Sequence, residues 1–170
     1  MIIYMKIQEN YIGLSGLKYI FDYEDSDDFS HLPYEKVKQC YGVCFTGNNT
    51  IVIVYNKNKD TWGLVGGTIE SGETYEQTLK REILEEANMK VVAFKPIGYQ
   101  KVTDARDNSY VYQLRFMCNV EPVGPFISDP AGSVTEIREI NPLEYKKYFN
   151  WGQIGQRIID RAQALKLIEK

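Results

Sequence analysis

Three glutamates at helical spacing are the residues of this sequence best suited to do chemistry. Glu82 stands three residues before Glu85 and four before Glu86, so the three carboxylates are neighbours if the segment is helical. Such like charges oppose helix formation by about 0.2 to 0.5 kcal/mol per pair. A divalent cation removes the conflict, because converging carboxylate oxygens suit Mg²⁺ or Mn²⁺. The pattern therefore indicates a metal site, although the spacing alone also allows an acidic patch in solvent.

A helix with one apolar stripe is predicted to position these acids. Thr74 can cap its N-terminus, with Gln77 as the reciprocal partner three residues later. Apolar residues then recur every four positions: Tyr75, Leu79, Ile83 and Ala87. At about 100° per residue, Glu82 and Glu86 fall on the border of this stripe. We therefore expect the acids to lie beside the buried face of the helix.

Two consecutive glycines precede the helix. Gly66 and Gly67 allow positive φ and a close approach of the backbone to a ligand, so a main-chain carbonyl could complete a metal shell while amides face phosphate oxygens. A tight turn without a ligand is the alternative. Trp62, just before the turn, could stack on a base or fill the core. These three residues are the substrate-binding candidates.

The spacing of this stretch resembles the Nudix box of the Nudix hydrolases. The resemblance runs from Gly67 to Met89 and rests on the residues Gly67, Glu73, Arg81, Glu82, Glu85 and Glu86. Asn88 stands where the family has glycine. Asparagine is the next residue of choice for the left-handed conformation that ends a helix. We therefore expect this departure to be structural and to leave the acids untouched.

The resemblance implies an enzyme, a Nudix pyrophosphohydrolase that uses Mg²⁺ or Mn²⁺. It implies hydrolysis of a phosphoanhydride in a nucleoside diphosphate linked to another group, with a (deoxy)nucleoside triphosphate as the default small substrate. Glu82 is implied to position or deprotonate the attacking water, and the implied metal ligands are Glu82, Glu85, Glu86 and Gly67. A catalytically silent nucleotide-binding or sensing module on the same fold is the rival hypothesis. The intact acids favour the enzyme.

Further catalytic residues are implied outside the three acids. The resemblance implies that Arg81 orients them and contacts Glu73. In some members of the family an additional base or metal ligand comes from a later loop, and Glu136 is the candidate here. Glu136 could equally be a surface strand residue, and Glu121 and Glu139 are alternatives.

The rest of the chain is predicted to form strands and one closing helix. The expected strands are 3–7, 40–45, 51–55, 91–94, 97–102, 110–117 and 136–140, with a hairpin joining the second and third. An amphipathic helix is expected over 154–170, and the polar segment 103–109 could border a pocket. Together these elements predict an α/β/α sandwich with a mixed sheet between helices, the fold that the resemblance also implies.

Length and composition bound the remaining possibilities. The 170 residues suit one domain, with an N-terminal extension over 1–39, which carries a strand and the solvated acidic loop 22–28, and a core over 40–170. A formal charge of -3 provides no basic field for duplex nucleic acid, and no segment is long enough to cross a membrane. Three cysteines without metal-finger spacing favour a reducing cytoplasm. The segment before Cys40 could supply a dimer arm.

Overall fold

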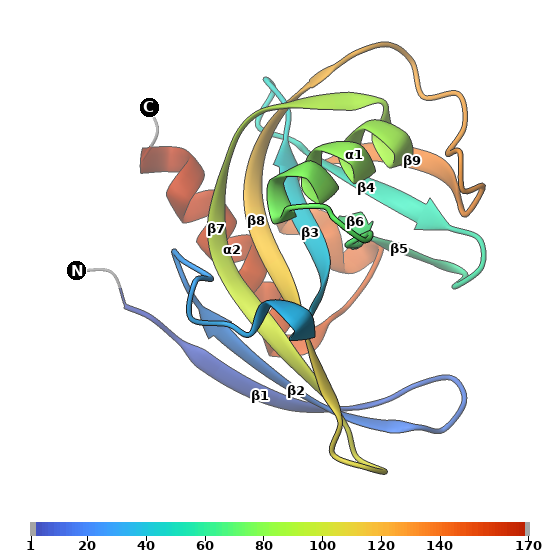
Figure 1. Ribbon diagram of the computed structural model, residues 1–170. Coiled ribbons are helices and arrows are strands. Elements are labelled where there is room, and N and C mark those ends of the chain that lie inside the picture. Colours follow the sequence, from blue (N-terminus) through green and yellow to red (C-terminus); the bar gives the residue numbers. More distant parts are fainter. Residues whose placement is uncertain (1–2, 169–170) are drawn as a thin grey trace.

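The computed structural model describes residues 3–168, whose strands form one mixed sheet (Figure 1). The main path through the sheet is β1-β2-β7-β8-β3-β4-β5, while β6 pairs with β3 and β9 pairs with β4. The strands are β1 Lys6–Ile12, β2 Lys18–Asp25, β3 Val37–Phe45, β4 Ile51–Asn56, β5 Thr61–Gly63, β6 Val65–Thr68, β7 Met89–Asp104, β8 Tyr110–Pro122 and β9 Val134–Ile140. Strands β3 and β8 run parallel, whereas the other pairings among the described strands are antiparallel.

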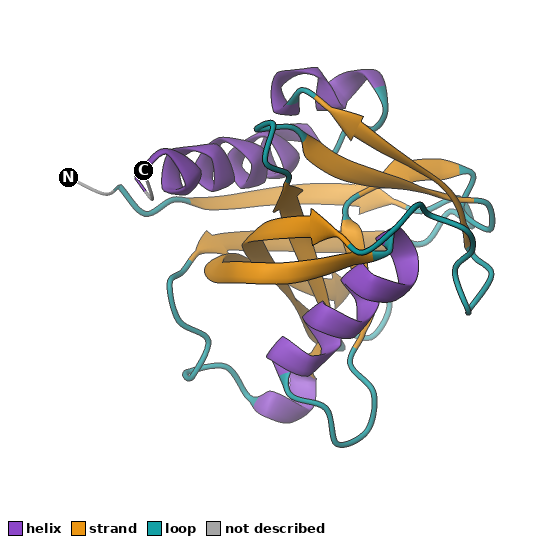
Figure 2. Cartoon of the chain, turned by 90° about the horizontal axis from the view of Figure 1, so that it is seen from above, coloured by secondary structure: helices purple, strands orange, loops and turns teal. Residues whose placement is uncertain are grey.

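Two α-helices cover opposite faces of this sheet. Helix α1, Tyr75–Ala87, packs with one buried cluster, and α2, Gly152–Ile168, packs with the other (Figure 2). Strand β3 serves both layers because successive side chains point to opposite faces: Cys40 belongs to the α1 cluster and Val43 to the α2 cluster. Two short 3₁₀ helices, η1 Tyr34–Lys36 and η2 Pro142–Lys147, complete the described elements. The predicted α/β/α sandwich is confirmed.

The predicted solvated loop over 22–28 was wrong for its first four residues. They belong to β2, which pairs with β7 over Tyr19 to Asp25. Tyr23 and Asp25 are buried, because strand alternation turns them inward. The Asp25 carboxylate is compensated by Arg157 of α2, whose Nη2 lies 2.5 Å from Oδ2. The alternation was not recognised from the sequence, because residues 22–28 consist mostly of charged side chains.

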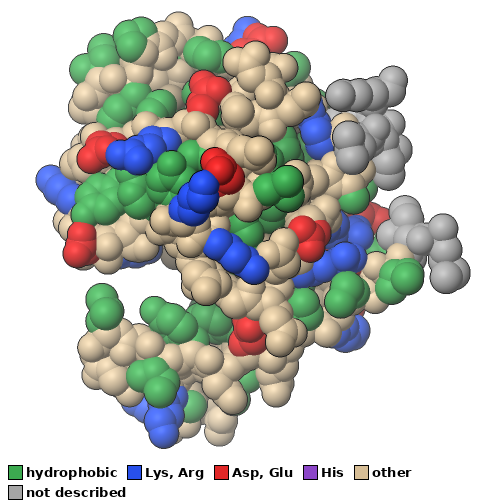
Figure 3. Space-filling model, turned by 180° about the vertical axis from the view of Figure 1, so that it is seen from behind, with side chains coloured by type: hydrophobic (Ala, Val, Ile, Leu, Met, Phe, Trp, Pro, Cys, Tyr) green, Lys and Arg blue, Asp and Glu red, His purple; other side chains and the backbone are tan. Residues whose placement is uncertain are grey.

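Other boundaries also differ from those expected. The first strand begins at Lys6 and continues to Ile12, and the predicted strands 91–94 and 97–102 are parts of one bulged strand, β7. The β3–β4 hairpin is confirmed, but it holds only two residue pairs, because β6 pairs with the same edge of β3 over Gln39 to Gly42. The segment 103–109 connects β7 to β8. Seen from behind, the surface is notched on the side of the β1–β2 turn (Figure 3).

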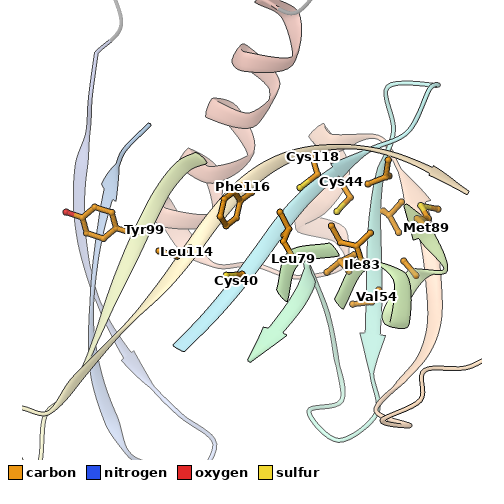
Figure 4. Packing of buried hydrophobic residues seen from close by; sticks show 14 of the residues in the cluster. Cys40, Cys44, Val54, Leu79, Ile83, Met89, Tyr99, Leu114, Phe116 and Cys118 are labelled. Carbon is orange, nitrogen blue, oxygen red and sulfur yellow. The ribbon is translucent and has the colours of Figure 1, made fainter. Parts of the chain in front are cut away.

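Apolar packing fixes α1 on the sheet. Leu79 and Ile83 of the predicted stripe are fully buried against sheet residues that include Cys40, Leu114 and Cys118 (Figure 4). Burying one such aliphatic side chain contributes roughly 1.5 to 3 kcal/mol. The three cysteines are unpaired and buried, as expected of reduced thiols. Within residues 3–168, no helix is long and apolar enough to span a bilayer.

Candidate active site

The ends of α1 are formed as the sequence predicts. Thr74 accepts the Gln77 amide at 3.2 Å, and the Gln77 side chain accepts the Thr74 amide at 2.8 Å, which completes the capping box. Asn88 adopts the left-handed conformation at the C-terminus, with φ 52 and ψ 45. Its side-chain nitrogen also donates to the Pro125 carbonyl at 2.8 Å. Asparagine therefore replaces glycine without loss of the cap and adds a contact that glycine cannot make.

The three acids of α1 lie beside its buried face. The side chain of Glu82 is 13 % exposed and that of Glu85 33 % exposed, and Glu86 is buried. Burial raises the pKa of Glu86 to about 8 even though its carboxylate accepts the Gly66 amide at 3.0 Å. Burial also raises the pKa of Glu82. A solvated acidic patch, the alternative reading of the spacing, does not describe these residues.

Arg81 connects the helix acids to the turn before the helix. Its Nε and Nη2 donate to Glu73 at 2.6 and 2.9 Å, which confirms the predicted contact. Its Nη1 donates to Glu82 at 2.8 Å and to Glu85 at 3.2 Å. The hydrogen bonds from Arg81 hold the pKa of Glu73 at about 2. One guanidinium thus orients three carboxylates.

The two glycines bring backbone close to these acids. Gly66 has φ +150, and a Cβ there would lie 2.1 Å from the Cys40 carbonyl oxygen. A Cβ on Gly67 would lie 2.6 Å from Oε1 of Glu82. The predicted tight turn was wrong, because both glycines lie in strand β6 and pair with Tyr41 and Cys40 of β3, and their close contacts are to protein groups. The Gly66 amide is used inside the site, since it donates to Glu86.

The donor chemistry of these residues fits a hard divalent cation. Glu82 and Glu86 are desolvated like charges on adjacent turns, and Gly67 leaves the space in front of Glu82 free of a side chain. Among residues 3–168, however, no three Asp, Glu, His or Cys side chains are gathered as a ready-made metal site. Glu82 and Glu85 share Arg81 instead. Cation binding here requires these carboxylates to turn toward one another.

A cavity of about 590 Å³ adjoins the acids. Gly66 and Glu86 line it where it meets α1. Its other walls come from β1, β2, β3, β4, β5, β7, β8 and the start of α2, and include the aromatic residues Tyr11, Phe21, Tyr41, Trp62 and Trp151. The segment 103–109 contributes no lining residue. The cavity therefore combines an acidic end with aromatic walls, as a pocket for a charged, ring-containing ligand requires.

The candidate site residues outside the Nudix box differ in whether they line the cavity. Trp62 lines the cavity and also packs against Tyr148, so it contributes to both the pocket and the core. Glu136 is an exposed residue of β9, 3.7 Å from Arg138. Glu139 accepts from Thr50, in the turn between β3 and β4, and Glu121 pairs with Lys90. None of these three glutamates lines the cavity.

Sequence reasoning missed Asp129, in the loop between β8 and β9. Its negative charge raises the pKa of both Glu82 and Glu86, after the larger effect of burial. Burial disfavours the charged form of Asp129, but hydrogen bonds from backbone amides, of which that of Val134 has the largest effect, lower its pKa. Its oxygens accept the amides of Ala131, Ser133 and Val134 at 2.9 to 3.1 Å. The available signal was an Asp followed by Pro-Ala-Gly-Ser, a turn that such a side chain caps.

The mixed sheet, the two helices and the box residues on α1 define a Nudix domain. A family model for the NUDIX domain matches residues 38–161, so the chain belongs to the Nudix family and is a hydrolase of that class. Nudix hydrolases generally use divalent metal ions and act on small nucleotide-linked substrates. No curated protein matches the chain in sequence.

Solved structures share this fold at low sequence identity. A mutant of the pyrophosphohydrolase BsRppH from Bacillus subtilis matches with a TM-score of 0.68 and 13 % identity, over 92 % of this chain and 97 % of that one. The NUDIX hydrolase from Nitrosomonas europaea matches with a TM-score of 0.63 and 18 % identity, over 77 % and 91 %. The MutT NUDIX hydrolase from Burkholderia pseudomallei gives 0.56 and 14 %, over 72 % and 95 %. At these identities the likeness establishes the fold.

Proposed function

We propose that the protein hydrolyses a phosphoanhydride bond in a nucleoside diphosphate linked to another group, with Mg²⁺ or Mn²⁺ as cofactor. A small nucleotide such as a (deoxy)nucleoside triphosphate is the proposed substrate. The observation that carries this proposal is the pair of desolvated acids, Glu82 and Glu86, beside the cavity that Glu86 lines. Buried like charges are costly unless a cation or a proton compensates them.

The acids of α1 have distinct proposed roles. When bound, a divalent cation would neutralise the pyrophosphate and make a water molecule more acidic. Glu82 accepts the proton of the attacking water as the new P–O bond forms and the anhydride P–O bond breaks. Glu85 and Glu86, with the Gly67 carbonyl and Glu82, are the proposed ligands. Arg81 holds Glu82 in place, and Glu73 holds Arg81.

Two proposed roles concern residues beyond α1. Trp62 of β5 and Gly66 of β6 line the cavity, which supports a role in holding the nucleotide. Glu136 stays a candidate for an additional base or metal ligand, although it pairs with Arg138 and lies outside the cavity lining. A Glu136→Gln protein with unchanged turnover removes Glu136 from the catalytic set.

The test is a nucleotide panel assayed with Mg²⁺, with the products identified. Glu82→Gln and Glu85→Gln should lower turnover by about 10²- to 10⁴-fold while the proteins remain folded. Glu76→Gln is the matched control, because Glu76 lies on the same helix, is exposed and pairs with Lys80. No turnover across the panel, together with tight nucleotide binding by calorimetry, would instead establish a binding or sensing module.

The proposed organisation is a single domain over 1–170 that acts in the cytoplasm without duplex nucleic acid or membrane. The segment before Cys40 forms the edge of the sheet through β1, which supports its proposal as a dimer arm. Light scattering of the full chain and of a Tyr11→Lys variant, altered on β1, tests this. A monomer in both proteins rules the homodimer out.

A further inference from the structure

Arg115 of β8 is a buried cation without an acidic partner. The residue is 4 % exposed, and among the described residues no carboxylate lies within ion-pair distance of it. Its Nη2 donates to the Gln113 side chain at 2.9 Å and its Nη1 to the Leu114 carbonyl at 3.2 Å. Its Nε is buried without any hydrogen-bond partner. Leaving such a donor unsatisfied costs about 1 to 3 kcal/mol. The structure pairs only two of the five guanidinium N–H groups, so an acceptor that reaches the Nη atoms from the cavity would stabilise the guanidinium.

The surroundings of Arg115 hold its guanidinium in a defined orientation. Gln113 accepts from Arg115 and donates to Gln39 at 2.6 Å, which fixes its amide. The guanidinium also lies 4.9 Å from the centre of the Tyr41 ring. Arg115 is thus a preorganised donor, and it lines the same cavity as Glu86.

Arg115 and the acids occupy different parts of this cavity. Tyr41 of β3 pairs with Gly66 of β6 on one side and with Arg115 of β8 on the other. Glu86 accepts the Gly66 amide at 3.0 Å. Tyr41 therefore lies between the acidic end of the cavity and Arg115. If phosphates bind at the acids, Arg115 faces the distal part of the ligand.

We propose that Arg115 binds the O6 and N7 acceptors of a guanine-type base and so selects 6-oxopurine nucleotides over adenine nucleotides. This rests on the proposed function, which supplies a nucleotide with its phosphates at the acids. Arginine pairs with adjacent O6 and N7 acceptors, whereas adenine presents an amino group beside N7 that opposes a cationic donor. The aromatic walls formed by Tyr41, Phe21 and Trp62 suit the flat faces of a base.

Calorimetric binding of nucleoside monophosphates to the full-length protein with Mg²⁺ tests this without turnover, because monophosphates contain no anhydride bond. GMP and IMP, which share O6 and N7, should bind with similar affinity. AMP, 2,6-diaminopurine riboside monophosphate and 7-deaza-GMP should each bind about tenfold or more weakly. Equal affinities across this series, or binding of UMP as tight as that of GMP, would overturn the proposal, and these measurements need no variant.

The Arg115→Met protein supplies the second arm, with Arg106→Met as the control, because Arg106 pairs with Asp104 at an exposed hairpin tip. Arg115→Met should bring GMP affinity down to that of AMP and leave AMP nearly unchanged. An equal loss for every base would show a phosphate-binding arginine and overturn the proposal. Hydrolysis of GTP and ATP with Mg²⁺ separates the two ideas. Hydrolysis of GTP and ATP without a preference for either base would overturn the role of Arg115 and leave the proposed function intact. Selective binding of GMP without hydrolysis of any nucleotide would overturn the proposed function and leave the role of Arg115 intact.

Discussion

The carboxylate of Glu9 in β1 accepts the backbone amide of Gln153, at the start of α2, at 2.9 Å. It also accepts the Ile154 amide at 3.3 Å, so a strand residue from the N-terminal hairpin caps the closing helix. Gly152 permits this approach, because a Cβ there would lie 2.4 Å from Glu9 Oε1. The cap brings together two walls of the cavity that are distant in sequence.

Removal of this cap should destabilise the protein. Glu9→Ala leaves two amides of α2 without their acceptor and removes a favourable charge from the helix N-terminus, for a loss of about 1 kcal/mol. Glu9→Gln retains an acceptor oxygen and should lose less. Denaturant unfolding of the three proteins measures both effects. Equal stability of Glu9→Ala and the wild type would show that water replaces the cap.

Arg81→Lys should impair both stability and turnover. Lysine keeps the charge but cannot donate to Glu73 with a fork while also reaching Glu82. We expect a loss of about 1 to 3 kcal/mol and a fall in kcat of about tenfold or more, because Glu82 loses its orientation. Arg106→Lys is the comparison, since its pair with Asp104 is exposed. Comparable effects in the two variants would contradict a positioning role for Arg81.

Alanine substitutions at Gly66 and Gly67 of β6 should separate folding from activity. A Cβ at Gly67 meets the end of a movable side chain, Glu82, so Gly67→Ala should stay folded and lose turnover by about tenfold or more. A Cβ at Gly66 meets the backbone at Cys40, at a φ that disfavours it, so Gly66→Ala should lower the melting temperature. Gly47→Ala, in open space, is the control. Full activity of Gly67→Ala would disprove the need for this approach.

Mg²⁺ should stabilise the protein through the acids of α1. A ligand that binds only the folded state raises the melting temperature with its concentration. Because burial raises the pKa of Glu86 to about 8, folding at pH 7 without metal requires this carboxyl to bind a proton, at a cost in stability. Glu86→Gln avoids that cost, so in EDTA the variant should be more stable than the wild type, by about 1 to 3 kcal/mol. It should also gain less from Mg²⁺. Scanning calorimetry in EDTA and in Mg²⁺ measures both quantities, and an equal gain in the two proteins would contradict metal binding at Glu86.

The buried thiols should make stability fall in alkaline solution. Burial raises the pKa of Cys40 to about 12 and raises the pKa of Cys118 well above its ordinary value of 9.0. Because the folded-state values lie above the unfolded ones, unfolding releases thiol protons only above about pH 9, and stability declines from there upward. Denaturant unfolding between pH 8 and 10 should show this decline, and Cys118→Ala should reduce it. A pH-independent stability would contradict the buried assignment.

Local features of α1 could be predicted because they depend on residues close in sequence. The capping box, the apolar stripe and the left-handed Asn88 are all decided within about one turn of their partners. The cavity could not be predicted in this way, because its walls come from both ends of the chain. Arg115 illustrates the limit: in the sequence it is one polar residue in a strand, and its burial appears only once β3 and β8 pair in parallel.

The acidic tract shows how a correct general rule can mislead. Charge runs are usually solvated, yet Asp25 is buried because Arg157, in a helix 132 residues later, provides its counter-charge. No local pattern indicates that partner. Asp129 was missed for a related reason, since its relation to Glu82 and Glu86 depends on how the β8–β9 loop returns toward α1.

The hydrogen bond from Asn88 to Pro125 gives the asparagine that replaces the family glycine a structural role. The bond ties the C-terminal end of α1 to the loop that carries Asp129, and the Val123 amide adds a second tie to the Asn88 carbonyl at 3.0 Å. Asn88, the residue that departs from the family pattern, therefore connects the helix that carries the three acids to the loop that carries the negative charge of Asp129.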